Sequence, residues 1–159
     1  MQEIETNINM CPSIIRDLIK VNGKPLVSLD FGCFQPNLAN RKFGRPLKVP
    51  LSHQAAAKYL GTLKKYSGQD DFELLKIAKT EHLSFFNKKI RFMKYSPLFK
   101  FYEKTYPILL KNILADKEAY GYKSVTRKMY TMEGNVMTEI VKRGMEKGII
   151  VIYIFDELL

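Results

Sequence analysis

Two segments, one near each end of the chain, have the residue pattern of β-strands. In residues 24–31 (KPLVSLDF) successive side chains alternate between two sides, which predicts a half-buried strand at about residues 25–31. This strand ends in the carboxylate of Asp30. Residues 149–159 (IIVIYIFDELL) are rich in β-branched side chains and predict a second strand that finishes in Asp156 and Glu157.

Between these segments apolar residues recur at steps of three and four, which predicts helices. Ser52 and Asp70 stand where N-terminal caps are expected. Proline has no backbone N–H, so Pro107 predicts a kink or a split. Residues 41–52 have the composition of a loop. The predicted helices cover residues 13–20, 53–66, 71–79 and 81–94. A further helix is expected to start at Pro97, and the last one has an apolar repeat from Val125 to Ile140 and ends at Gly148.

The order strand, several helices, strand predicts an α/β fold, with one small antiparallel sheet and several packed helices. The length of 159 residues suits a single domain over residues 1–159. The longest apolar stretch, residues 149–155, is too short to cross a bilayer, and residues 1–10 lack the apolar run of a signal peptide. We therefore expect a cytoplasmic protein without a membrane partner.

The charge of the chain favours a polyanionic partner. The sequence has 26 Lys and Arg against 16 Asp and Glu, a formal net charge of +10. Much of this surplus falls in residues 82–111, where aromatic residues are interleaved with the cations. Cations pair with phosphates and rings stack on bases, so nucleic acid is the expected partner. The alternative is that the rings form the core and the lysines a solvated face.

The cysteines and histidines show no short metal-binding spacing. Cys11 and Cys33 lie far apart without a CxxC pattern, which indicates reduced intracellular thiols. His53 and His82 lie far from any cysteine or paired carboxylates in sequence. We interpret both histidines as surface or cap residues.

The two strand-end aspartates suggest a metal site. Carboxylates from neighbouring strands hold pairs of divalent cations roughly 3.5–4 Å apart in nucleotidyl transferases. Mg²⁺ is a hard ion that prefers such oxygen ligands. Most aspartates at strand ends form turns or cap helices and do not bind metal. The residues around Asp30 and Asp156 therefore decide whether these two are metal ligands.

The segment around Asp30 carries a resemblance to a known family. Residues 16–39, RDLIKVNGKPLVSLDFGCFQPNLA, resemble the motif A region of family A DNA polymerases, in the compact form found on phages and mobile elements. The resemblance implies that Asp30 is the first metal ligand. It also implies that Gln35 lies beside the sugar of the incoming nucleotide, where many members have Glu.

The end of the chain resembles motif C of the same family. Residues 129–158 match the helix, turn and strand that deliver this motif. The resemblance implies that Asp156 is the second metal ligand and that Glu157 is an auxiliary one. It places Glu133 in a helical turn beside the primer-template.

The middle of the chain resembles the fingers of the family. Residues 101–113, FYEKTYPILLKNI, are similar to its Phe-x-x-x-Tyr-Pro segment, and Lys88-x-x-x-Phe92 is similar to its fingers helix. Lys88 and Arg91 are accordingly expected to bind the triphosphate. The basic side chains expected to bind nucleic acid are Lys89, Lys94, Arg127 and Lys128.

Together these matches imply a truncated palm and fingers region over about residues 14–159. The implied layout is a motif A strand at about 25–31, a fingers-like helical region at about 52–115, and a motif C helix and strand at about 122–157. The implied activity is DNA-directed DNA polymerisation with two Mg²⁺ ions, a DNA primer-template and dNTPs.

Two departures from the family pattern leave other functions open. Phe155 stands where the family has His, and the chain ends three residues after Asp156, before a further strand of the motif C hairpin. These departures favour a catalytically inactive remnant that binds nucleic acid through its basic helices. A third possibility is a basic module for protein partners, without nucleic-acid binding.

Overall fold

The computed structural model describes residues 18, 20–21, 23–25, 29–149, 153–154 and 157–158. The chain forms two compact units. One unit comprises Gly32–Gly134, and the other comprises Met1–Phe31 together with Asn135–Leu159. The predicted helix at residues 13–20 falls mostly outside the described residues, and Lys20 at its end belongs to a strand.

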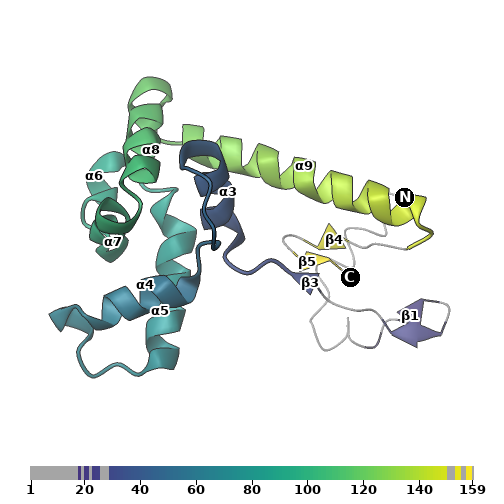
Figure 1. Cartoon of the computed structure of the whole chain (residues 1–159), viewed down its shortest axis with the longest axis horizontal. Helices are drawn as coiled ribbons and strands as arrows, with labels where there is room; N and C mark the ends of the chain where they lie inside the picture. The colour runs from purple at the N-terminus through teal and green to yellow at the C-terminus, as the bar shows by residue number, and fades with distance from the viewer. Residues whose placement is uncertain are drawn as a thin grey trace. The chain divides into compact units, whose positions relative to one another are not determined.

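Helices make up most of the described chain (Figure 1). The last of them is the longest, with 23 residues. A short 3-10 helix, η1, covers Lys64–Tyr66. The α-helices are α3 (Phe34–Phe43), α4 (His53–Gly61), α5 (Asp71–Phe85), α6 (Ile90–Met93), α7 (Pro97–Thr105), α8 (Pro107–Tyr120) and α9 (Ser124–Glu146).

The strands are short, two residues each, and the prediction of an α/β palm-like fold is wrong. Two small antiparallel ladders are present in the described residues, β1–β2 and β3–β5–β4. Ladders of this length bury little surface, and the helices supply the core instead. The strands are β1 (Lys20–Val21), β2 (Lys24–Pro25), β3 (Leu29–Asp30), β4 (Tyr153–Ile154) and β5 (Glu157–Leu158).

The single strand predicted near the end of the chain is a pair of strands. Tyr153 of β4 lies opposite Leu158 of β5, and Ile154 lies opposite Glu157. β4 and β5 are thus antiparallel neighbours separated by two residues. Glu157 was expected to end the single predicted strand, but it begins a separate strand, β5.

The helix starts follow the predicted caps. The Ser52 hydroxyl accepts a hydrogen bond from the Ala55 amide at 3.2 Å. The Asp70 carboxylate accepts one from the Glu73 amide at 2.8 Å. Each side chain satisfies one of the amides that the first helical turn leaves without a partner. The predicted interruption at Pro107 is also confirmed, because α7 ends at Thr105 and α8 begins at Pro107.

Several parts of the helical region differ from prediction. Helix α4 ends at Gly61, and α5 runs without a break through residue 80. Helix α3 begins directly after β3 and runs to Phe43, into the segment expected to be a loop. The helix predicted over residues 81–94 is broken, because α5 ends at Phe85 and α6 begins at Ile90. In the break the Asn87 amide group donates to the Leu83 carbonyl at 2.9 Å, which satisfies one of the last carbonyls of α5.

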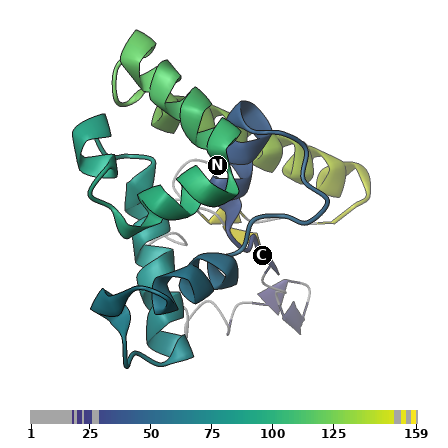
Figure 2. The ribbon, with the colours of Figure 1, turned by 60° about the vertical axis from the view of Figure 1, so that its left-hand side comes forward.

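The core of the Gly32–Gly134 unit is an aromatic cluster centred on Tyr102. This side chain is fully buried, and its ring stacks on Phe85 with centroids 4.9 Å apart. Phe86 and Phe101 meet the same ring edge-on. Helices α4 and α5 pack side by side in this unit (Figure 2). Four of the aromatic residues considered for base stacking, Phe85, Phe86, Phe101 and Tyr102, are therefore core residues.

A buried lysine forms hydrogen bonds both to the break after α5 and to the turn before α9. Lys117 of α8 is 3% exposed, and its ammonium donates to the carbonyls of Phe86, Lys88 and Tyr122 at 2.7, 3.0 and 2.7 Å. Burial lowers the pKa of Lys117 to about 8, although the charge of Asp116 acts in the opposite direction. One side chain thus satisfies carbonyls from two separate loops.

Replacing Lys117 with methionine is expected to lower the free energy of unfolding by about 2 kcal/mol, because buried carbonyls lose their donor while the aliphatic volume is kept. Urea denaturation measures this change. Lys111→Met on the same helix is the matched control, since Lys111 is exposed, and it should change stability by less than about 0.5 kcal/mol. Equal effects of the two substitutions would show that the loop carbonyls do not depend on Lys117.

Candidate functional site

One of the two aspartates predicted to bind metal lies in a described strand. Asp30 ends β3 and lies directly opposite Glu157 of β5 in the antiparallel register. Asp156 immediately precedes Glu157 in sequence but lies outside the described residues. A site made of carboxylates at this ladder position fits the oxygen-donor preference of Mg²⁺.

The residues predicted to bind the nucleotide differ in how available they are. Lys88 is held by an ion pair, because its ammonium lies 2.8 Å from a carboxylate oxygen of Glu81. Ser96 donates to the same oxygen at 2.8 Å. Burial would raise the pKa of Glu81, but these two hydrogen bonds outweigh it and the pKa is lowered. Arg91 is exposed and stacks over Phe92, whereas Gln35 is half-buried in α3.

The residues predicted to bind nucleic acid lie at the two ends of α6 and in α9. Lys89, Lys94 and Arg127 are exposed. Lys128 is half-buried and forms an ion pair with Asp116, which reduces the charge that it offers to a ligand. Glu133 is half-buried in α9.

Several aromatic rings are exposed next to these cations. The Lys89 ammonium lies 5.3 Å from the centre of the Tyr122 ring, and Lys123 lies 5.8 Å from it on the neighbouring residue. Tyr95 is 86% exposed and directly follows Lys94. Rings and cations together on a surface are what single-stranded nucleic acid contacts through its bases and phosphates. Phe92 and Tyr95 therefore remain candidates for stacking.

The structure also assembles a cluster that the sequence did not reveal, formed by Cys33, His53 and His82. Cys33 lies at the start of α3, His53 at the start of α4, and His82 in the last turn of α5. The Cys33 sulfur is 3.7 Å from Nδ1 of His53, which is 2.8 Å from Nδ1 of His82. One ligand atom from each residue lies within 4.8 Å of the other two.

The environment of this cluster keeps its side chains neutral. Burial lowers the pKa of His82 to about 3, with a further contribution from the neighbouring His53. Burial and the charge of Lys79 lower the pKa of His53. Burial raises the pKa of the Cys33 thiol to about 12. Neutral imidazoles are the form that binds metal ions, whereas the thiol must lose its proton to do so.

The interpretation of the two histidines as surface or cap residues is wrong for His82, which is 2% exposed, while His53 is half-buried at the start of α4. The three residues are 20 and 29 positions apart in sequence, which matches no short metal-binding pattern. In the sequence, the only hint of this cluster is the small number of such residues. The chain has two histidines and two cysteines, and three of these four side chains meet.

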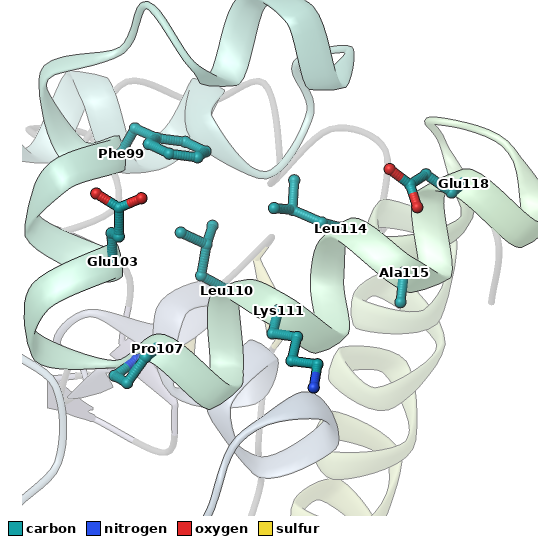
Figure 3. A pocket seen from close by; sticks show the side chains of 8 residues that line it. All are labelled: Phe99, Glu103, Pro107, Leu110, Lys111, Leu114, Ala115 and Glu118. Atoms are coloured by element: carbon teal, nitrogen blue, oxygen red, sulfur yellow. The ribbon is translucent and has the colours of Figure 1, made fainter.

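An apolar groove lies between α7 and α8, and it is lined by residues other than the site residues named above. It encloses about 440 Å³, and Phe99, Leu110 and Leu114 face its hollow (Figure 3). Glu103 and Glu118 lie at its margin. Phe99 and Lys111 of its lining belong to the segment 82–111 that was predicted to contact nucleic acid, and the lining offers no cluster of catalytic groups.

No protein-family model, curated protein or solved structure matches the chain. The resemblance to family A DNA polymerases thus stays an interpretation of the motifs. Across the part of the chain that the structure describes, no helix has the length and apolar character needed to span a membrane.

Proposed function

We propose that this chain carries out template-directed nucleotidyl transfer on a DNA primer-template, with Asp30, Asp156 and Glu157 as the carboxylates that hold two Mg²⁺ ions. The observation that carries the proposal is the register of β3 and β5, in which Asp30 lies opposite Glu157. These residues are 127 positions apart, and the motifs that contain them were recognised separately. Their pairing supports a shared carboxylate site.

The chemistry of such a site follows from its ligands. When bound there, the two Mg²⁺ ions would activate the 3′-hydroxyl of the primer and stabilise the departing pyrophosphate. Asp30, Asp156 and Glu157 would supply the hard oxygen ligands that this ion prefers. Arg91, as an exposed guanidinium, suits the triphosphate better than Lys88, whose charge Glu81 already balances.

The distribution of charge supports nucleic acid as the partner. Residues 32–134 contain 20 Lys and Arg against 8 Asp and Glu, whereas the rest of the chain contains 6 against 8. The whole surplus of the protein therefore belongs to the Gly32–Gly134 unit. Only a few of these cations, such as Lys88 and Lys128, form ion pairs with carboxylates among the described residues.

The same charge distribution favours a second candidate function, nucleic-acid binding without catalysis. Binding through Lys89, Lys94 and Arg127 needs neither Mg²⁺ nor the carboxylates. It would weaken steeply with salt, because each neutralised phosphate releases condensed counterions. Phe155 in place of the family histidine is compatible with this candidate, since phenylalanine cannot donate a hydrogen bond to the primer terminus.

A primer-extension assay on a primed DNA template with Mg²⁺ and dNTPs separates the two functions. The wild-type chain is expected to extend the primer, and Asp30→Asn is expected to lower the rate at least about a hundredfold because a metal ligand is lost. Asp70→Asn is the matched control. Asp70 is an exposed helix cap, and asparagine caps equally well, so extension should be unchanged.

Measuring DNA affinity on the same proteins at several salt concentrations completes the test. Asp30→Asn should bind primer-template as tightly as wild type, because the basic side chains are intact. Salt-sensitive binding without extension by the wild-type chain would refute nucleotidyl transfer and leave the second candidate. Absence of binding at physiological salt would refute both.

A further inference from the structure

We propose that Cys33, His53 and His82 bind one Zn²⁺ ion, which fastens the start of α3, the start of α4 and the end of α5 to one another. This site belongs wholly to the Gly32–Gly134 unit. It goes beyond the nucleotidyl transfer proposed above and does not depend on it, because its ligands and its metal are different.

The spacing of the ligand atoms suits a zinc ion. Zinc lies about 2.3 Å from a thiolate sulfur and about 2.0–2.1 Å from an imidazole nitrogen, so tetrahedral geometry separates sulfur from nitrogen by about 3.6 Å and two nitrogens by about 3.3 Å. The Cys33 sulfur and His53 Nδ1 are 3.7 Å apart. The His53 and His82 nitrogens, 2.8 Å apart, would need to separate by about half an ångström, which a small rotation of one ring provides.

The burial of His82 supports its role as a ligand. Its side chain is 2% exposed, and Tyr102 packs edge-on against the imidazole, with ring centroids 5.9 Å apart. This packing confines the ring with its Nδ1 2.8 Å from Nδ1 of His53. A ligand that is held in place before the ion arrives loses little side-chain entropy when the ion binds.

The backbone at Cys33 supports the same conclusion. Its φ of 57° and ψ of 40° lie in the left-handed region, and it is the one non-glycine residue with positive φ in the described part of the chain. Residues other than glycine adopt this conformation at a cost of about 1–2 kcal/mol, and such positions concentrate at functional sites. Here the strained residue carries the thiol that faces His53.

The chemical types of the three ligands indicate which metal ion the site would bind. One sulfur and two imidazole nitrogens favour zinc, whereas Mg²⁺ prefers oxygen. Three protein ligands leave a fourth position for water. The three ligands come from three different elements, so the ion would act as a cross-link between segments that are 20 and 29 residues apart in sequence.

The test uses the full chain without a histidine tag, stripped of metal with EDTA and then titrated with Zn²⁺. One equivalent per chain is expected to bind, and a hundredfold excess over Kd should raise Tm by about 5–10 °C. Substitution with Co²⁺ should produce a thiolate-to-metal charge-transfer band in the near ultraviolet. Cys33→Ser should lose this band and weaken zinc binding at least roughly a hundredfold.

Cys11→Ser is the matched control, because Cys11 is the other cysteine of the chain, and it should bind zinc as the wild type does. His53→Gln provides a second ligand variant at a half-buried position if Cys33→Ser does not fold, and circular dichroism reports folding. Failure of the folded wild-type chain to retain zinc would overturn the proposal. So would equal zinc binding by wild type, Cys33→Ser and His53→Gln. Neither result bears on primer extension.

Discussion

Replacement of Tyr102 by alanine is expected to lower the free energy of unfolding by about 4 kcal/mol. Tyr102 is fully buried, stacked on Phe85 and in edge contact with Phe86 and Phe101. Alanine would remove the ring on which the other three converge and leave a cavity that rigid helices fill only in part. Urea denaturation followed by circular dichroism measures the loss.

Tyr102→Phe distinguishes the contribution of the ring to stability from that of the hydroxyl group. The hydroxyl is buried and has no hydrogen-bond partner within the described chain. Phenylalanine keeps the stacked ring and removes this unsatisfied group, so stability should be unchanged or rise by up to about 1 kcal/mol. A large loss with phenylalanine would show that the hydroxyl, and not the aromatic packing, stabilises the core.

Helix ends were the part of the fold that the sequence predicted best. Ser52, Asp70 and Pro107 act through the backbone atoms of their own first turns, so their effect does not depend on distant residues. The long helix that begins at Ser124 also follows its apolar repeat directly. Each of these features is caused by residues that are close together in sequence. A short stretch of sequence is therefore enough to predict it.

The parts that were predicted wrongly depend on distant contacts. The break after Phe85 is stabilised by Lys117, whose ammonium reaches the carbonyls of Phe86 and Lys88 from 29 or more residues away. Apolar spacing alone continues through this break. Likewise the C-terminal end of α3 receives a hydrogen bond from Asn112 to the Phe43 carbonyl, 69 residues away. No local pattern encodes either contact.

The predicted sheet failed because alternation is a weak signal over a short segment. Residues 24–31 alternate, but within them the described strands cover only Lys24–Pro25 and Leu29–Asp30. The helices bury the large aromatic side chains without help from a sheet. The register between β3 and β5 places Asp30 opposite Glu157. The resemblance calls for Asp30 beside Asp156, which lies outside the described residues, so that pairing stays a prediction.

The two candidate metal sites differ in how far the sequence alone could reveal them. The carboxylates were predicted to be metal ligands because each stands in a motif with recognisable neighbours. Cys33, His53 and His82 have no such neighbours, and only the packing of α4 against α5 brings the two histidines together. The sites also differ in chemistry, since oxygen ligands suit Mg²⁺ and sulfur and nitrogen ligands suit Zn²⁺. Each can therefore be loaded and tested separately.

The protein without metal, kept in EDTA, is expected to lose stability as pH falls below 6.5, because of His82. Burial lowers the pKa of this imidazole from 6.5 to about 3 in the folded state. Between these values the unfolded chain binds a proton that the folded chain does not, so the free energy of unfolding decreases as pH decreases. The expected loss is about 2 kcal/mol at pH 5 relative to pH 7, and roughly 4 kcal/mol over the whole window.

Urea denaturation of wild type and His82→Gln at pH 7, 6 and 5 tests this dependence. The two proteins share the same carboxylates, so the small contribution of groups such as Glu81 near pH 5 cancels in the comparison. Glutamine cannot titrate, and the variant should therefore lose much less stability than wild type between pH 7 and 5. The slope is the informative quantity, because glutamine also alters packing against Tyr102 at every pH. Parallel curves for the two proteins would show that His82 accepts a proton without unfolding, and that its burial does not restrict its charge.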